Sequence, residues 1–174
     1  MRARAIRLGV LVTLAIVAYA QPKPKDVEGW DKIKWSMTLA EVRSAYQIDA
    51  QPESKDNWTL LQLKPVKIAG VELGVQVAAK QDAGKIGSVT LWSYFGLPNS
   101  APSAGPQDFD TLKNALIQEY GAPANEQSTR GLNFRLLKSV IWKFPSTSVL
   151  LTLEQSASLP NLGNIDLQYT PVPK

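Results

Sequence analysis

The pattern of apolar and polar residues first predicts a short amphipathic helix in the N-terminal third of the chain. Leu39, Val42 and Tyr46 recur at helical spacing and therefore share one face. Thr38 and Glu41 have the spacing of a capping box, in which the threonine hydroxyl accepts a backbone N–H and the glutamate reaches back to the threonine N–H. We therefore expect a helix that begins directly after Thr38.

After this helix the pattern changes to the two-residue period of strands. Residues 49–57 form a polar connection that is rich in turn-forming residues. Three strand candidates follow, at residues 58–66, 71–79 and 88–95. The second of these alternates almost perfectly between apolar and polar side chains, as a half-buried strand does. Residues 96–107 then make a linker rich in proline, glycine, serine and alanine.

The second half of the chain follows the same order. Asp108 is a suitable N-cap for a second helix, and Gly121 followed by Pro123 would end it. An apolar stripe at helical spacing lies between them, made by Phe109, Leu112, Leu116 and Tyr120. Strand candidates follow at residues 132–137, 140–144, 148–153 and 164–169.

The two halves superpose without a gap when the second is moved back by about 74 residues. Val42 then meets Leu116, and Tyr46 meets Tyr120. An old duplication would explain these matches, and chance similarity between two units of one helix plus strands is the alternative. The sequence thus predicts an α+β fold of two tandem α-β-β-β repeats, with the helices packed on one face of an antiparallel sheet.

The first 20 residues have the features of a cleaved signal peptide. Three arginines precede a short apolar run, and Ala18-Tyr19-Ala20 supplies the small-residue pattern that signal peptidase recognises. The run is shorter than the ~20 residues that a membrane span needs, although an uncleaved N-terminal anchor is the alternative. We therefore expect a bacterial protein that is periplasmic or secreted, with no stable membrane span after cleavage.

The predicted organisation has five segments that follow from these patterns. They are a signal peptide at residues 1–20, a flexible lead-in at 21–32, repeat one at 33–95, a linker at 96–107 and repeat two at 108–174. The lead-in is expected to be flexible because two of its first residues are prolines, which remove backbone donors and block a helix.

The charge of the chain gives no support for a nucleic-acid partner. The full sequence has 19 basic and 15 acidic residues, for a net charge of +4 and a pI near 9.3. Three of the basic residues lie in the expected signal peptide, which leaves 16 basic against 15 acidic residues. Nucleic-acid binding requires a clustered basic face, and the remaining charges are mixed. The chain also has no cysteine, so packing rather than disulfides must stabilise it.

Two short motifs resemble a group of small exported bacterial proteins. Residues 34–42 (Lys-Trp-Ser-Met-Thr-Leu-Ala-Glu-Val) resemble the motif W-G-M-(S/T)-x-x-E-V, with Ser36 where glycine is usual, and residues 120–123 (Tyr-Gly-Ala-Pro) resemble the motif (L/Y)-G-x-P that closes helices in this group. The group includes the outer-membrane assembly lipoproteins of the BamE (SmpA/OmlA) type and the tandem-repeat beta-lactamase inhibitor proteins. The resemblance implies a similar arrangement of helices and strands.

The composition excludes most kinds of catalytic site. With no histidine and no cysteine, a Ser-His-Asp triad, a Cys-His pair and a zinc site built on His or Cys are impossible. The glycines form neither a P-loop nor a dinucleotide-binding motif. Asp108 and Asp110 are the closest carboxylate pair, but a role at the helix start explains both. We therefore predict no catalytic residues, no metal site and no cofactor, and hence not an enzyme.

A mixture of aromatic and polar residues on one sheet face is the candidate partner-binding site. Side chains alternate between faces along residues 88–95, so Thr90, Trp92 and Tyr94 would point away from the helices. Four polar residues of neighbouring strands would share that face, namely Gln76, Lys80, Thr152 and Glu154. Such a face suits a protein loop, a peptide or a glycan. The alternative is that Trp92 and Tyr94 simply pack under the linker.

Three functions are compatible with these features. The sequence favours an exported, non-enzymatic protein-binding or envelope-assembly module that uses the open sheet face and has a protein or peptide partner, since nothing in it forms a catalytic constellation. The first alternative is a carboxylate-dependent hydrolase of envelope polymer. The second is a carrier that holds a small ligand between the sheet and the helices.

Overall fold

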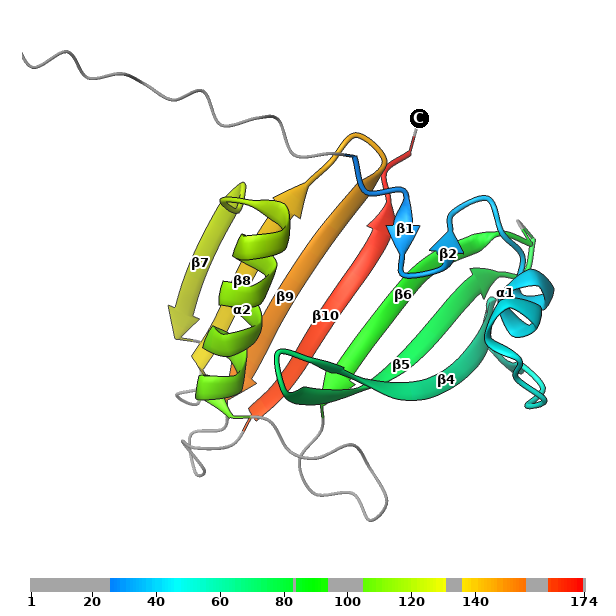
Figure 1. The fold of residues 1–174 in the computed structure, drawn as a ribbon, viewed down its shortest axis with the longest axis horizontal. Coiled ribbons are helices and arrows are strands. Elements are labelled where there is room, and N and C mark those ends of the chain that lie inside the picture. The colour runs from blue at the N-terminus through cyan, green and yellow to red at the C-terminus, as the bar shows by residue number, and fades with distance from the viewer. Residues whose placement is uncertain (1–25, 83, 94–104, 131–135, 156–162, 174) are drawn as a thin grey trace, which may run out of the picture.

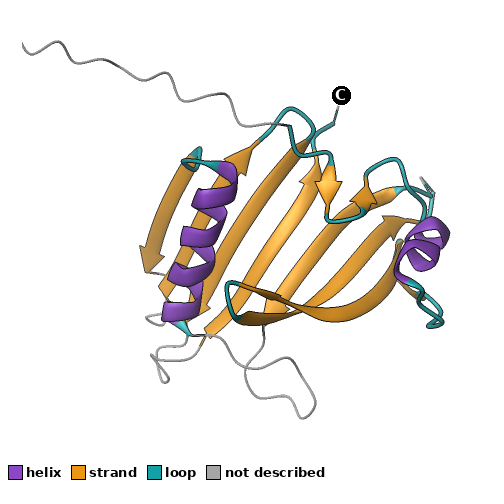
Figure 2. Cartoon of the chain, viewed as in Figure 1, coloured by secondary structure: helices purple, strands orange, loops and turns teal. Residues whose placement is uncertain are grey.

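One antiparallel sheet dominates the computed structural model of the chain, which describes residues 26–82, 84–93, 105–130, 136–155 and 163–173 (Figures 1 and 2). The sheet has eight strands, in the order β3-β4-β5-β6-β10-β9-β8-β7, and neighbouring strands are antiparallel. In chain order the elements are β1 (Gly29–Trp30), β2 (Ile33–Lys34), α1 (Leu39–Tyr46), β3 (Glu53–Lys55), β4 (Trp58–Ile68), β5 (Val71–Lys80), β6 (Ile86–Ser93), α2 (Pro106–Tyr120), β7 (Asn125–Arg130), β8 (Leu136–Lys143), β9 (Thr147–Gln155) and β10 (Gly163–Pro171).

The predicted α+β fold of two tandem α-β-β-β repeats with helices packed on the sheet is wrong. The described residues are mostly β, with 55% in strands and 19% in two helices. β6 pairs with β10 at the centre of the sheet, so strands of both halves of the chain form one continuous sheet. The prediction gave too much weight to the helices, because a capping box is a strong local signal. It also missed the strands β3 and β7, because all their residues are exposed and therefore show no apolar alternation.

The start of α1 agrees with the prediction, and the start of α2 does not. The Thr38 hydroxyl accepts the Glu41 N–H at 3.3 Å, and the Glu41 carboxylate accepts the Thr38 N–H at 2.7 Å, so the capping box is confirmed. α2 begins earlier than expected, with Gly105 as its N-cap and proline at its first position. Asp108 is therefore not the N-cap; its carboxylate instead accepts the Gly105 N–H at 2.7 Å.

Two strand predictions need correction. β4 continues past residue 66, because a bulge at residues 64–65 takes up Pro65 without ending the strand. The strands predicted at 132–137 and 140–144 are, over residues 136–143, the single strand β8, since Lys138 and Ser139 continue its pairing with β9. The predicted signal peptide, residues 94–104 and residues 132–135 lie outside the described residues.

One face of the sheet, here called the closed face, is buried. α2 and the β1–β2 hairpin lie on the same side of the sheet, toward the viewer in Figure 1. The sheet contributes fully buried apolar side chains, among them Val75, Val77, Leu91, Leu151, Ile165 and Leu167. α2 contributes Phe109, Leu112 and Leu116, β2 contributes Ile33, and α1 contributes Val42 to the same core. Neither helix of the described part is long and apolar enough to cross a membrane.

Part of the segment expected to be a flexible lead-in is structured. The Asp26 carboxylate accepts the Ser146 N–H at 3.0 Å and the Ser146 hydroxyl at 2.6 Å, which ties this segment to the turn between β8 and β9. β1 and β2 then form a tight hairpin that requires Gly29, because a Cβ at this position would lie 1.8 Å from the Ile33 carbonyl oxygen.

Candidate functional site

The face of the sheet opposite the closed face, here called the open face, carries exposed and half-exposed polar and aromatic side chains, together with the aliphatic side chains of Leu137, Ile141 and Leu150. It consists of the alternate positions along the strands, among them Trp58, Gln62, Gln76, Lys80, Thr90, Trp92, Thr152, Glu154, Asp166 and Gln168. Apart from Trp58, each of these side chains follows or precedes a buried one, as Trp92 follows Leu91 and Asp166 precedes Leu167. The alternation separates a core-building face from a face that other molecules can reach.

The structure places six of the seven predicted site residues on the open face. Gln76 and Thr90 are register partners on β5 and β6. Trp92 on β6 and Thr152 on β9 are both register partners of Asp166 on β10. Glu154 lies two residues from Thr152 on β9. Lys80 stands apart at the end of β5. Tyr94 and residues 96–104 of the linker, which the alternative places over Trp92, lie outside the described residues.

The Trp92 ring lies flat over the neighbouring strand, on a glycine that leaves room for it. Gly74 is the register partner of Trp92 on β5. A Cβ at Gly74 would lie 3.1 Å from two atoms of the six-membered ring and 3.4 Å from a third. Three nearly equal distances show that the ring is stacked on the backbone at Gly74. Its other face is therefore turned away from the sheet.

A second tryptophan reaches a glycine at the other end of β5, but it meets this glycine with the outer edge of its ring. β6 has a bulge at Gly87, and a Cβ there would lie 2.8 Å from the Trp58 ring. The ring therefore reaches from β4 across β5 to β6, over the backbone of the bulge. The Lys80 ammonium lies 5.7 Å from the centroid of this ring, within the range of a cation–π contact. A hollow of ≈ 600 Å³ lies beside it, lined by Asn57, Trp58, Lys80, Gln81 and Asp82.

Carboxylates gather on the open face next to Trp92. Asp166 is the direct register partner of Trp92 on β10. Glu154 is its diagonal neighbour on β9, because Thr152 pairs with Asp166 and Glu154 pairs with Asn164. Partial burial, and then the negative charge of Glu154, raise the pKa of the Asp166 carboxyl above its ordinary value. Two carboxyl groups therefore lie close together on this part of the open face.

A row of three amide side chains and one hydroxyl crosses the centre of the open face. Gln62, Gln76, Thr90 and Gln168 are successive register partners on β4, β5, β6 and β10. An amide side chain offers both donors and an acceptor, so this row can hydrogen-bond to peptide groups or to hydroxyls.

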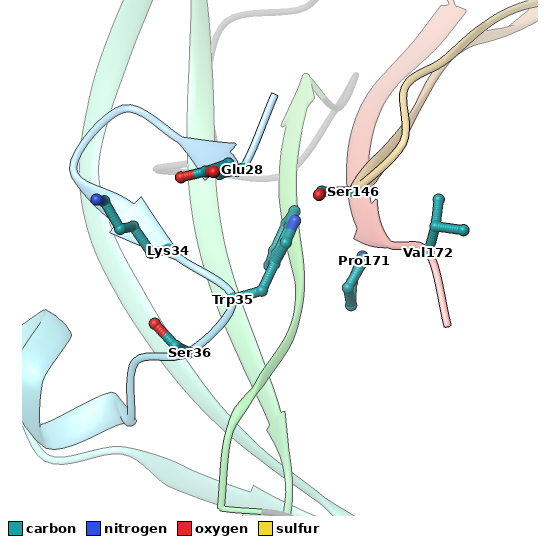
Figure 3. Close-up of a pocket in the computed structure, with 7 residues that line it drawn as sticks. All are labelled: Glu28, Lys34, Trp35, Ser36, Ser146, Pro171 and Val172. Atoms are coloured by element: carbon teal, nitrogen blue, oxygen red, sulfur yellow. The ribbon is translucent and has the colours of Figure 1, made fainter. Parts of the chain in front are cut away.

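A separate small cavity of ≈ 240 Å³ lies beside the β1–β2 hairpin (Figure 3). Trp35 stands at its centre, with Glu28 and Lys34 on one side of the ring and Ser146, Pro171 and Val172 on the other. The Trp35 indole N–H donates to the Thr147 hydroxyl at 2.8 Å, and the Thr147 hydroxyl donates to the Val27 carbonyl. These hydrogen bonds join the N-terminal segment to β9, so we assign Trp35 and Thr147 the structural role of holding this segment on the sheet.

Neither a metal site nor a carboxylate pair at the start of α2 is formed in the part of the chain that the structure describes. No group of three or more Asp and Glu side chains is close enough to hold a metal ion there. The Asp108 carboxylate accepts the Gly105 N–H at the start of α2, and the Asp110 carboxylate lies 3.9 Å from the Lys138 ammonium. The two aspartates thus serve separate structural contacts.

Sequence reasoning missed Trp58, Gln62, Asp166 and Gln168 as members of the site. Alternation along each strand places these residues on one face, but only the order of the strands shows which of them are neighbours. Asp166 lies far from Trp92 in sequence and becomes its partner through the central pairing of β6 with β10. Comparison of the chain with models of protein families, with curated proteins and with solved structures found no match.

Proposed function

We propose that the chain is an exported, non-enzymatic module that binds a protein or peptide partner of the bacterial envelope through the open face. The observation that supports this proposal most strongly is the position of Trp92, whose ring lies flat on Gly74 among half-exposed polar side chains. Tryptophan supplies a large contact area for little loss of rotamer entropy, and it is common among the residues that dominate binding energy.

The sequence motifs are consistent with this proposal. The apolar run and the Ala18-Tyr19-Ala20 pattern support export, and the resemblance of residues 34–42 to the opening motif of envelope proteins supports the location. The absence of histidine and cysteine from the chain removes the common nucleophilic and acid–base sites. A binding role requires none of these residues.

A carboxylate-dependent hydrolase is the second candidate, and the pair Asp166 and Glu154 favours it. A carboxyl with a raised pKa beside a second carboxyl group is the arrangement that glycoside hydrolases use, and Trp92 would offer a ring on which a sugar can stack. The two functions differ in a simple test. A hydrolase would degrade purified envelope glycan and lose that activity in both Asp166→Asn and Glu154→Gln, whereas a binding module would leave the polymer intact.

A photo-crosslinking experiment tests the binding proposal. A photoreactive residue placed at Thr90 on the open face should attach to one defined envelope protein in living cells. The same residue placed at Asn114, which is exposed on α2, is the matched control and should not. Trp92→Ala, combined with the photoreactive residue at Thr90, should remove the product. Equal attachment from both positions, or attachment from Asn114 alone, would contradict the proposal.

A further inference from the structure

We propose that β7 is an interface strand, to which the β7 strand of a second copy of this chain pairs edge to edge. β7 is the last strand at one edge of the eight-stranded sheet, and no strand of the described residues pairs with its outer side (Figure 1). All six of its residues are exposed. This pairing goes beyond the proposed function and does not depend on what the open face binds.

β7 lacks several of the features that usually protect the edge of a sheet. Natural edge strands are often very short, or carry proline, lysine or a bulge. β7 contains neither proline nor lysine, and its register with β8 has no shift. Its two charged residues, Glu126 and Arg130, are of opposite sign. The strand at the other edge, β3, has only three residues and includes Lys55. β7 is therefore the edge that is better suited to accept another strand.

The backbone hydrogen bonds of β8 alternate between its two neighbours. In an antiparallel pair, directly opposite residues exchange hydrogen bonds at every second position. Phe144 donates its N–H to the carbonyl of Thr147, the residue opposite it, at 2.8 Å. The even-numbered residues of β8 therefore bond to β9, and the odd-numbered ones bond to β7. Ile141 agrees with this alternation, because its carbonyl accepts the Ala124 N–H at 2.7 Å.

This alternation decides which backbone groups of β7 face outward. The odd-numbered residues of β8 are the register partners of the odd-numbered residues of β7. The even-numbered residues Glu126, Ser128 and Arg130 therefore direct their N–H and C=O groups to the free edge. Their side chains lie on the side of the closed face, because Glu126 is the register partner of the buried Val140.

A twofold axis at Ser128 would bring all these outward-facing groups together. An axis perpendicular to the sheet relates two antiparallel copies of an edge strand and keeps their open faces on the same side. Ser128 then lies opposite Ser128 of the second copy, and Glu126 lies opposite Arg130 of the second copy. Each such pair can exchange two backbone hydrogen bonds. The dimer would also present two open faces to one surface, which strengthens binding to a partner with repeated sites.

The charges select this position of the axis over its neighbours. An axis at Glu126 or at Arg130 would place like charges directly opposite each other, which is unfavourable. An axis at Gln127 or at Thr129 pairs neither charge with its opposite. Only the axis at Ser128 matches Glu126 with Arg130 on both sides of the dimer. The Lys113 ammonium, 2.8 Å from the Glu126 carboxylate, holds this carboxylate on the closed-face side.

α2 leaves room for the second copy. The Lys138 ammonium on β8 lies 3.9 Å from the Asp110 carboxylate and 5.5 Å from the centroid of the Phe109 ring, so α2 lies over β8. In the joined sheet the two β8 strands are three strand spacings apart, roughly 14 Å at about 4.8 Å per spacing. Packed helices require only about 8–10 Å between their axes. The two α2 helices therefore fit side by side.

Disulfide formation reads the position of the axis, because the chain has no cysteine of its own. Ser128→Cys places each thiol opposite its own copy, at a Cα separation of about 5.5 Å that a disulfide accepts. Mild oxidation of this variant, in the chain without residues 1–20, should give a covalent dimer. Gln127→Cys and Thr129→Cys place the paired thiols two residues out of register and should not. Asn114→Cys, at an exposed position of α2, is the control for random collisions.

Charge reversal tests the pairing of Glu126 with Arg130. Because the strands meet along one edge, the interface is small, and we expect a reversible dimer that sedimentation equilibrium measures. Glu126→Arg and Arg130→Glu should each raise the dissociation constant at least about tenfold at low salt, since each places like charges opposite each other twice. An equimolar mixture of the two variants should associate like wild type, because every pair is again of opposite charge. Asn114→Arg should change nothing.

Melting curves check that each variant is folded, since Glu126→Arg also repels Lys113. Should Glu126→Arg fail to fold, Arg130→Glu and the cysteine variants still test the pairing.

Three results would overturn the inference. The first is a wild-type chain that stays monomeric at every concentration. The second is oxidation of Gln127→Cys, Thr129→Cys or Asn114→Cys to a dimer as readily as Ser128→Cys. The third is a mixture of the two charge variants that associates no better than either alone. Crosslinking from Thr90 tests the proposed function separately, so a monomer that still captures a partner leaves that function in place.

Discussion

The two faces of the eight-stranded sheet are made from the same strands and have opposite chemistry. On β6, Leu91 is fully buried on the closed face, and Trp92 next to it is half-exposed on the open face. On β10, Leu167 is buried, and Asp166 next to it is half-exposed. Since adjacent residues of a strand point to opposite faces, substitutions at neighbouring positions should affect stability on one face and binding on the other.

Tryptophan occurs on both faces and gives a direct comparison. Trp142 is 1% exposed on the closed face, and its indole N–H donates to the Gly121 carbonyl at 2.9 Å. Trp92 lies over Gly74 on the open face and keeps part of its surface accessible. The same side chain therefore fills the core in one place and forms part of a surface in the other. Replacing the two side chains should therefore have very different costs in stability.

Replacement of Trp142 should cause the largest loss of stability. Trp142→Ala removes a fully buried ring and leaves a cavity, which costs about 3–5 kcal/mol of unfolding free energy. Urea denaturation measures this loss. Trp142→Phe is the control, because it keeps an aromatic ring in the core and loses the hydrogen bond to Gly121. A mild effect of Trp142→Ala, comparable to that of a surface substitution, would contradict the assignment of the closed face as the core.

Thr147 tests how the closed face tolerates a polar group. Its hydroxyl is fully buried, accepts the Trp35 indole N–H and donates to the Val27 carbonyl. Thr147→Val keeps the shape and leaves both partners without this hydrogen bond, so we expect a loss of about 2 kcal/mol of unfolding free energy. Thr147→Ser retains the hydroxyl and should lose less. Equal stability of the valine and serine variants would show that the hydrogen bonds contribute nothing.

Trp92 should matter much less for stability than Trp142. Trp92→Ala uncovers the backbone at Gly74 and loses partial burial of one ring, for an expected cost of about 1 kcal/mol of unfolding free energy. The measurement is urea denaturation under the conditions used for Trp142→Ala. A loss as large as that of Trp142→Ala would mean that the open face is part of a core.

Asp166 should show the smallest effect, with the opposite sign. Its pKa in the folded protein lies above the ordinary value of 3.8 because of burial and the charge of Glu154. Stability from this group is therefore present below the ordinary pKa and is lost as the pH rises through the folded pKa. Asp166→Asn should raise the unfolding free energy at pH 7 by about 0.5 kcal/mol.

Unfolding curves at pH 3 and pH 7 check the sign of the Asp166 effect. The advantage of Asp166→Asn over wild type should grow from pH 3 to pH 7, and Glu154→Gln should reduce the pH dependence of wild type, since it removes the repulsion. An advantage that shrinks toward neutral pH would show that Asp166 is stabilised, not destabilised, in its ionised form.

Local signals predicted the elements of this fold better than their assembly. The capping box at Thr38 and the alternation along β5 depend only on near neighbours, and both are present as expected. The edge strands β3 and β7 were missed because all their side chains are exposed, so no apolar period marks them. The pairing of β6 with β10 joins the halves of the chain at the centre of the sheet, and no local pattern encodes it.

The candidate site was predictable to the same degree. Strand alternation is enough to place Thr90 and Trp92 on one face, and the structure agrees. The meeting of Trp92 with Asp166 required the strand order. The stacking of Trp92 on Gly74 also required it, because a glycine has no side chain that could signal a neighbour on the next strand.

The affinity of Trp92→Ala for the partner captured from Thr90 tests the account most directly. We expect the dissociation constant to rise about 30-fold or more, equivalent to about 2 kcal/mol of binding free energy, while the unfolding midpoint moves only slightly. Unchanged affinity together with a collapsed melting temperature would contradict the account, because Trp92 would then be a structural residue and the open face would have no demonstrated role in binding.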